Sequence, residues 1–256
     1  LSVLPTGGVY LAGGIAPRPV STPAAGEFTI ASANMLRFYD AVNDPGGDVA
    51  LTPLAFERRV AKAAMAICDY MKAPDIVGMV EVENLNALQA LADRLNATCS
   101  RGPQYQPYLE PGNDVGNINI GFLVNTAEVR PSVPRVRVVS VTQYGKDAVI
   151  TNPNGSTSTM NDRPPLVLRA ELNGSAGAPV PVTVIGNHLL SLISINDNSP
   201  GSNGYASNGE RRRVKRAEQA VFLAGLVQQF QQANPGERIV LLGDFIAFEF
   251  NDGYVD

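Results

Sequence analysis

The chain has 256 residues, 45% of them hydrophobic, which is enough apolar material for one large folded domain or two small ones. Its formal net charge of −4 excludes a protein that is basic throughout, so binding to nucleic acid would need a local basic patch or a metal ion. No stretch is long and apolar enough to span a membrane.

The first 26 residues are rich in proline and glycine and show no sustained period, which predicts a turn-rich arm or linker before a folded domain at residues 27–256. This segment lacks the charged start and long apolar centre of a signal peptide, so we expect a mature or processed form. Residues 28–34 alternate between apolar and small side chains and predict a strand that ends at Asn34.

After an irregular loop, Thr52 and Pro53 predict the start of a helix, because threonine caps helices and proline is favoured at the first helical position. Apolar residues then recur at spacings of three and four as far as Met71, so one face is expected to pack on a core. Pro74 is expected to end this segment.

Residues 76–82 form an apolar run that predicts a buried strand, with the carboxylates of Glu81 and Glu83 at its end. Asn84 is expected to cap a second helix that buries its leucines. The order strand, helix, strand, helix favours a layered α/β fold.

The middle of the chain is richer in strands. They are predicted at residues 118–124, 136–144, 166–172 and 180–185. Loops rich in asparagine, glycine and proline separate them without a helical pattern, which favours antiparallel neighbours and therefore a mixed sheet.

A long loop at residues 191–208, full of asparagine, serine and glycine, is expected to be a mobile part of the surface. An amphipathic helix is predicted at residues 210–232, and its first turns carry the basic run ERRRVKR. Its apolar side is expected to consist of Val214, Ala217, Val221, Leu223, Leu226, Val227 and Phe230. Such a run is usually a solvated helix face. The alternative is contact with phosphate groups through Arg211 and Arg212.

Four polar residues, Asn34, Glu81, His188 and Asp244, lie at or just past the ends of predicted strands; Asp244 follows the apolar run at residues 239–243. Each also has an ordinary explanation: Asn34 as a turn former, Glu81 as a surface charge, His188 as a hydrogen-bonded strand end and Asp244 as a cap of the next turn. Together they indicate an oxygen-ligand site suited to Mg²⁺, Mn²⁺ or Ca²⁺. His188 is the chain's only histidine and a candidate acid or base.

Six motifs occur in a recognisable order along the chain. They are ASANMLRF, IVGMVEVEN, NINIGFLV, NDRPPLVL, GNHLLS and LLGDFIAFEFNDGYVD. In this order they resemble the endonuclease/exonuclease/phosphatase superfamily, which is deoxyribonuclease I-like, and are most similar to its secreted bacterial nucleases. The resemblance implies a four-layer α/β/β/α sandwich with mixed sheets that hydrolyses phosphate esters with a divalent cation.

The resemblance also implies roles for the residues in these motifs. Asn34 and Glu81 would hold the metal. Asn187, His188 and Asp244 would act at the phosphate, with His188 contacting or protonating an oxygen and Asp244 orienting the groups around it. Arg163 would position a neighbouring loop or a phosphate.

The sequence departs from the superfamily pattern in three places. Ile246 replaces an asparagine, Asn119 stands where many relatives have aspartate, and the final strand with its Ser-Asp-His motif is absent. The chain would then be a fragment, a processed form or a relative that no longer catalyses. A missing edge strand would also leave a sheet edge open to self-association.

Two classes of function therefore stay open: an extracellular or periplasmic metal-dependent phosphodiesterase, foremost a nuclease, and a non-catalytic binding or self-assembling protein. Cys68 and Cys99 do not have the spacing of a metal site and form either one disulfide or two buried thiols. Because they lie near the ends of consecutive predicted elements, we expect the disulfide. Low lysine content and loops rich in asparagine, glycine, serine and threonine favour secretion.

Overall fold

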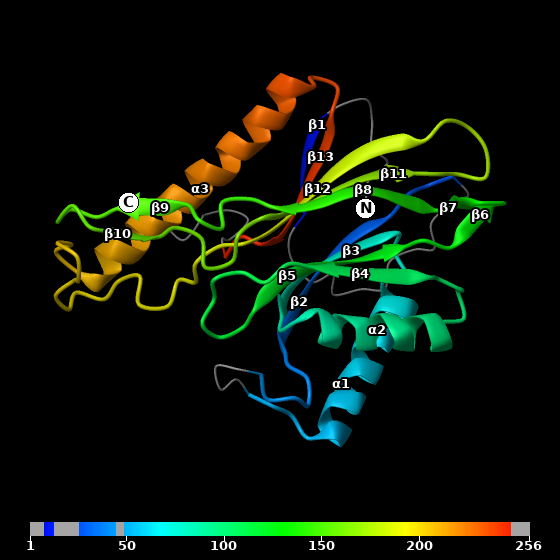
Figure 1. The fold of residues 1–256 in the computed structure, drawn as a ribbon, viewed down its shortest axis with the longest axis horizontal. Coiled ribbons are helices and arrows are strands. Elements are labelled where there is room, and N and C mark those ends of the chain that lie inside the picture. Colours follow the sequence, from blue (N-terminus) through cyan, green and yellow to red (C-terminus); the bar gives the residue numbers. More distant parts are fainter. Residues whose placement is uncertain (1–7, 13–25, 45–48, 247–256) are drawn as a thin grey trace.

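A computed structural model describes residues 8–12, 26–44 and 49–246. They form two main β-sheets that lie face to face, with helices on the outer side of each (Figure 1). The helices are α1 (Pro53–Met65), η1 (Ala66–Tyr70), α2 (Leu85–Thr98) and α3 (Asn208–Ala233), where η1 is a π-helical turn.

The first sheet has four strands in the order β2-β3-β5-β4. Their bounds are Ile30–Phe38 for β2, Ile76–Val82 for β3, Tyr105–Leu109 for β4 and Asn119–Asn125 for β5. β2 and β3 run parallel, whereas the other pairs are antiparallel. The sequence predicted three of these strands. It missed β4, whose five residues include Pro107 and too few apolar positions to show a period.

The second sheet has the order β1-β13-β12-β11-β8. Its strands are β1 (Gly8–Ala12), β8 (Val136–Gln143), β11 (Leu166–Leu172), β12 (Val180–His188) and β13 (Arg238–Asp244). β13 lies parallel to β1 and β12, and β11 is antiparallel to its neighbours, so both sheets are mixed as predicted. β1 falls within the segment expected to be a turn-rich arm, and it occupies the outer edge of β13.

Two small hairpins lie outside the main sheets. They are β6 (Glu128–Arg130) with β7 (Val133–Pro134), and β9 (Val149–Thr151) with β10 (Thr157–Thr159). None of these strands was predicted, because two or three residues are too few to show an alternating pattern.

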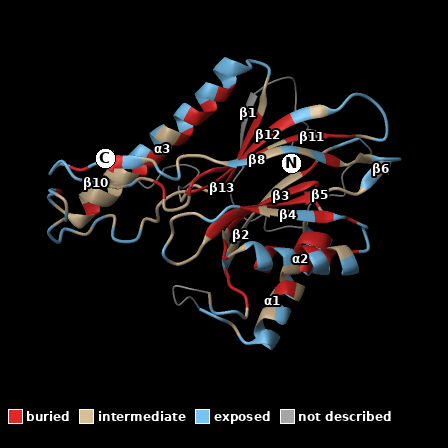
Figure 2. Ribbon diagram, viewed as in Figure 1, coloured by how far each residue is buried: buried red, intermediate tan, exposed pale blue. Residues whose placement is uncertain are grey.

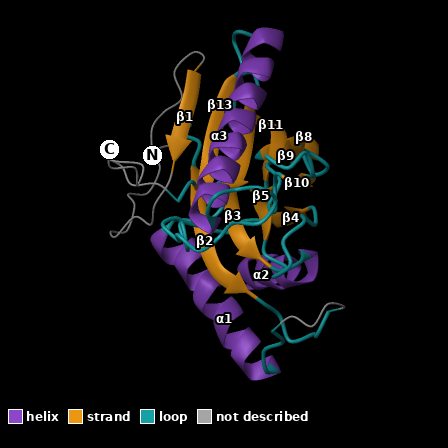
Figure 3. Cartoon of the chain, turned by 90° about the vertical axis from the view of Figure 1, so that its left-hand side faces the viewer, coloured by secondary structure: helices purple, strands orange, loops and turns teal. Residues whose placement is uncertain are grey.

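Three separate hydrophobic clusters lie between four layers of secondary structure. One joins α1 and α2 to the first sheet through residues such as Leu88 and Met79, and a second lies between the sheets around Phe122. The third packs α3 on the second sheet through Phe230 and Ile185. Buried positions concentrate on the strands in Figure 2, and Figure 3 shows α3 running along the sheet that contains β11 and β13. The predicted four-layer α/β/β/α sandwich is confirmed.

Side chains cap the helices where the sequence indicated starts. Thr52 Oγ1 accepts a hydrogen bond of 3.2 Å from the amide of Ala55, and Asn84 Oδ1 accepts one of 2.8 Å from Ala87. The first α-helix ends at Met65 rather than near Met71, because the chain continues as the π-helical turn η1.

The buried face of α3 differs from the predicted one. Ala217 and Val221 were expected on the apolar side, yet both are exposed, Val221 to 68%. Arg216 and Gln219 are buried instead. The first half of α3 packs on loops rather than on strands: Gln219 donates to the carbonyl of Met160 and accepts from the amide of Leu190. Loop backbone groups need polar partners, so this part of the helix buries polar side chains.

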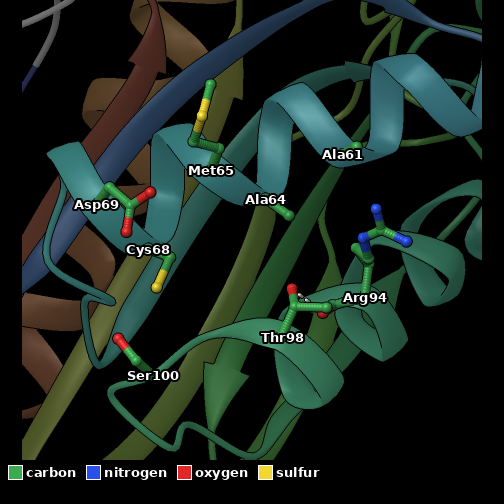
Figure 4. Close-up of a pocket in the computed structure, with 8 residues that line it drawn as sticks. All are labelled: Ala61, Ala64, Met65, Cys68, Asp69, Arg94, Thr98 and Ser100. Atoms are coloured by element: carbon green, nitrogen blue, oxygen red, sulfur yellow. Dashed lines mark hydrogen bonds between the residues drawn. The ribbon is translucent and has the colours of Figure 1, made fainter.

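Cys68 and Cys99 form a disulfide, with their Cα atoms 5.6 Å apart. It links η1 to the residue that follows α2. A surface pocket of about 200 Å³ lies above it, between Ala64 of α1 and Thr98 of α2 (Figure 4). None of the residues lining this pocket is one of the strand-end residues singled out in the sequence.

Candidate active site

The structure brings four strand-end residues from both sheets to one place. The Nδ2 atom of Asn34 donates to Glu81 Oε1 at 3.0 Å and to Asp244 Oδ2 at 3.2 Å. Asn34 and Glu81 belong to the first sheet, whereas Asp244 ends β13 of the second. The prediction that the strand ends at Asn34 was wrong, because β2 continues to Phe38 after a register shift that follows Asn34. His188, level with Asp244 across the β12–β13 pair, has its Nε2 atom 4.0 Å from Glu81 Oε1.

A β-bulge directs Glu81 toward this point. The pairing of β3 shifts register between Val80 and Val82, and Glu81 between them has a φ of +61°. A bulge re-aims one side chain without ending the strand. The carboxylate of Glu81 therefore reaches the strand edge while both its neighbours stay buried in the core.

Gly243 allows the backbone of β13 to lie close to Asn187 of β12 just before Asp244. Its φ is +120°, and a Cβ atom there would lie 2.0 Å from the carbonyl oxygen of Asn187. The amide of Gly243 also donates to Ser32 Oγ on β2 at 3.1 Å, which ties the second sheet to the first. Glycine is therefore required by both backbone conformation and space.

Asp244 is held in a fixed orientation by the turn that follows it. Its Oδ1 atom accepts from the amide of Ile246 at 2.8 Å, and its carbonyl accepts from the amide of Leu189 at 3.1 Å. Ile246 has a φ of +50°. This left-handed conformation is unusual for a β-branched residue and costs on the order of 1–3 kcal/mol.

His188 is only 5% exposed. Burial and, to a smaller extent, the positive charge of Arg163 together lower the pKa of His188 from 6.5 to about 4, against the opposing effect of the Asp244 carboxylate. The imidazole is therefore neutral at pH 7. Within the described residues, its buried Nδ1 atom has no hydrogen-bond partner.

Asn187 belongs to β12, pairs with Gly243 of β13 and is fully buried. Its Nδ2 atom donates to the carbonyl of Leu242 at 3.1 Å, and its Oδ1 atom has no hydrogen-bond partner among the described residues. Its amide therefore braces the two strands whose ends carry His188 and Asp244.

Arg163 supports the loop after β12. It donates to the carbonyls of His188 at 3.3 Å and Leu189 at 2.8 Å, and it pairs with the carboxylate of Asp114 at 2.8 Å. The side chain is only 8% exposed. This geometry fits the loop-positioning alternative better than contact with a phosphate.

The basic run at the start of α3 is not simply a solvated face. Arg213 donates to the carbonyl of Ile195 at 2.6 Å, and Lys215 pairs with Asp162 at 2.7 Å. Arg216 donates to the carbonyls of Leu190 and Ile246, the latter at 3.1 Å. These side chains donate hydrogen bonds to loop carbonyls and pair with a carboxylate. Positively charged side chains are therefore partly buried where the helix lies against loops.

Arg211 and Arg212 lie on the first turns of α3 and are half-buried. Hydrogen bonds from Ser199 chiefly hold the pKa of Asp197 below its ordinary value, and the charge of Arg212 adds to this. Within the described part of the chain, no hydrogen bond or ion pair joins either arginine to the four strand-end residues. Their contact with substrate stays a prediction.

Sequence reasoning missed an irregularity within β2, between Asn34 and Phe38, where Leu36 and Arg37 form a left-handed turn. Both residues are left-handed, with φ of +52° and +59°, a conformation that costs roughly 1–2 kcal/mol per residue. The amide of Leu36 donates to Asn34 Oδ1 at 2.8 Å, and that of Arg37 donates to Glu81 Oε2 at 3.0 Å. The turn thus satisfies the remaining oxygens of Asn34 and Glu81. Only the two positive φ angles, invisible in the sequence, identify it.

Asn119 has a structural reason to be an amide. Its Nδ2 atom donates to the carbonyl of Glu83 at 2.6 Å, and its Oδ1 atom accepts from the amide of Gly112 at 2.7 Å. An ionised aspartate could make only the second bond. The departure from the superfamily pattern therefore suits the loop that precedes β5.

The donor set at the strand ends fits a hard divalent cation. Two carboxylates, those of Glu81 and Asp244, share one amide donor of Asn34, so negative charge is concentrated around a single nitrogen. Carboxylate oxygens are ligands that Mg²⁺ and Ca²⁺ prefer. Asn34 presents its Nδ2 atom to the two carboxylates, so it would bind a cation only through its Oδ1 atom, which here accepts from the amide of Leu36. Among the described residues, no group of three or more His, Cys, Asp and Glu side chains forms a metal cluster, so a cation here would also need water or substrate oxygens.

No model of a protein family matches the sequence, and a search of curated proteins finds no match either. Among solved structures, the chain is similar to a beta hairpin deletion mutant of beta toxin from Staphylococcus aureus, with 16% identity, a TM-score of 0.48, and coverage of 87% of this chain and 68% of that one. It is also similar to ANGEL2, a 2',3'-cyclic phosphatase, with 13% identity, a TM-score of 0.48, and coverage of 87% and 53%. The chain spans about half the length of the ANGEL2 structure.

Proposed function

We propose that this chain hydrolyses phosphodiester bonds with a divalent cation and that its substrate is nucleic acid. The observation that carries the proposal is the meeting of Glu81 and Asp244 at the amide of Asn34, with His188 beside them. Phosphoryl transfer requires little covalent chemistry from a protein. It requires placed charges and donors around the phosphate, and this cluster supplies them.

Glu81 and Asn34 are the residues that would hold the cation, which is Mg²⁺, Mn²⁺ or Ca²⁺ by the chemistry of their oxygens. When bound, such a cation polarises a phosphate oxygen and offsets the charge that develops on it. The Leu36–Arg37 turn fixes the orientation of the Asn34 and Glu81 side chains, because its two backbone amides donate hydrogen bonds to them.

His188 and Asp244 act on the phosphate itself. A neutral, buried imidazole carries one N–H donor, and His188 would use it to hydrogen-bond a phosphate oxygen, because the neutral ring has no acidic proton to transfer. Asp244 is held by the amides of Ile246 and Asn34, so its carboxylate would orient the attacking water.

Ile246 supports the alternative function, a non-catalytic protein used for binding or self-assembly. Its amide holds Asp244, but its side chain neither donates nor accepts a hydrogen bond where the superfamily pattern has asparagine. A fold that keeps its site geometry does not by itself retain the chemistry.

The Cys68–Cys99 disulfide supports an extracellular or periplasmic location, because disulfides persist in oxidising compartments. Within the described ranges, no helix has the length and hydropathy needed to cross a bilayer.

Hydrolysis of single-stranded DNA, double-stranded DNA and RNA, with Mg²⁺ or Mn²⁺ and with chelator, tests the proposal. We expect metal-dependent cleavage that falls by roughly 10²–10⁴-fold in Asp244→Ala, because one of the groups acting at the phosphate is lost. Asp197→Ala, an acidic residue in the loop before α3, is the matched control and should retain activity.

Ile246→Asn completes the experiment. Asparagine tolerates the left-handed conformation that Ile246 adopts and restores a polar side chain, so this variant should cleave faster than the native chain. Absence of cleavage in both the native chain and Ile246→Asn, with both proteins folded, would contradict the proposal and favour the binding alternative.

A further inference from the structure

The Leu36–Arg37 turn is built so that its backbone serves the site while its side chains face outward. Both amides are used by Asn34 and Glu81, yet Leu36 is 72% exposed and Arg37 is also exposed. Two consecutive left-handed residues persist only when their surroundings hold them, and such positions concentrate at functional sites.

Arg59 of α1 also holds the turn, through its backbone carbonyls. Its guanidinium donates to the carbonyls of Met35, at 3.1 Å, and Leu36, and it lies 5.7 Å from the centre of the Phe38 ring. The turn is therefore fixed by two side chains of the site on one side and by a helix on the other. The backbone from which the Arg37 side chain extends is therefore held in one conformation.

Arg37 differs from the other arginines around the strand ends. Arg163 and Arg216 donate to loop carbonyls and are nearly buried. The Arg37 guanidinium makes no hydrogen bond or ion pair within the described part of the chain, although its own amide is bonded to the proposed metal ligand Glu81. Arg37 is thus an exposed cation whose backbone is bonded to the site and whose side-chain donors are available.

We propose that Arg37 binds a phosphate oxygen of the substrate, which makes it a substrate-binding residue of the site; this inference rests on the proposed function. A guanidinium offers five donors in a planar fork that matches the oxygens of a phosphate. In a chain with a net charge of −4, an exposed cation three residues after Asn34 also reduces the repulsion that a polyanion meets on approach to the site. The substrate class favoured is one with several phosphates, such as an oligonucleotide.

A binding measurement tests the role of Arg37 independently of catalysis. The ligand is a fluorescein-labelled phosphorothioate 10-mer of single-stranded DNA, and its equilibrium binding is measured in chelator at several salt concentrations. We expect Arg37→Gln to bind about 10-fold more weakly, as loss of one charge-assisted contact predicts, with a smaller salt dependence. Arg58→Gln, the same charge change at an exposed position on α1, should bind like the native chain. Arg37→Lys should recover part of the affinity, because charge remains and the fork does not.

Melting curves establish that each variant is folded, since the structural bond at this position comes from the backbone amide of Arg37 and not from its side chain. Equal weakening in Arg37→Gln and Arg58→Gln, or no binding by the native chain, would overturn the inference. Selective weakening in Arg37→Gln without DNA hydrolysis by the native chain would support Arg37 as a phosphate contact and reject the proposed catalysis. DNA hydrolysis by the native chain, with unchanged KM and unchanged binding in Arg37→Gln, would support the proposed catalysis and reject Arg37 as a phosphate contact.

Discussion

The two helical layers of the sandwich pack in different ways. α1 and α2 bury alanine, valine and leucine side chains and are tied together by the Cys68–Cys99 disulfide. α3 buries apolar residues only in its second half, while its first half buries Arg216 and Gln219 against loops. One layer therefore serves mainly stability, and the other also holds the loops that position Asp244 and His188.

Removing the disulfide should have the largest effect on stability and should leave the site intact. The bond closes a separation of 31 residues in the chain, for which the loss of chain entropy in the unfolded state predicts about 3–4 kcal/mol. Urea unfolding of a Cys68→Ala, Cys99→Ala double variant, beside native protein with and without reductant, measures this. A loss below about 1 kcal/mol would show that the α1–α2 layer is held by its apolar contacts alone.

Lowering the pH should destabilise the fold through His188, on the side of the sandwich that α3 organises. Its pKa is about 4 in the folded protein and near 6.5 when unfolded. The unfolded state therefore binds more protons between these values, and stability that is complete above pH 6.5 is lost as the pH falls. The loss should reach roughly 2 kcal/mol by pH 5.

Urea unfolding between pH 7.5 and pH 5, in chelator, measures this dependence in the native chain and in His188→Gln. The carboxylates near the site titrate in both proteins, so the difference between the two curves isolates the histidine. Parallel curves would contradict a buried, neutral His188.

Replacing Arg216 should have the smallest effect on global stability but a local effect on the site. Arg216→Met removes donors from the carbonyls of Leu190 and Ile246, which we expect to cost about 1–2 kcal/mol. Hydrogen exchange of the amides of Leu189 and Ile246, both bonded to Asp244, should accelerate. Arg213→Met, which removes a donor from Ile195 only, should leave these amides protected. Equal protection in both variants would mean that α3 does not order the site.

Much of the fold could be predicted from local sequence. Apolar runs and periodic leucines located most long strands and the helices, and Thr52 and Asn84 marked two helix starts because capping depends on residues within one turn. The meeting of Asn34, Glu81, His188 and Asp244 was also predictable, since polar residues at the ends of buried strands share one edge of a layered fold.

What only the tertiary structure decided depends on neighbours distant in sequence. The basic residues of α3 turn inward because the loops after β12 and β13 present carbonyls there, and β1 has its place because β13 offers an open edge. The left-handed turn at Leu36 and Arg37 has a local bond to Asn34, but it exists because Glu81 of β3 and Arg59 of α1 also hold it. No local propensity favours that conformation in leucine or arginine, so the exposed cation beside the site could be found only in the folded chain.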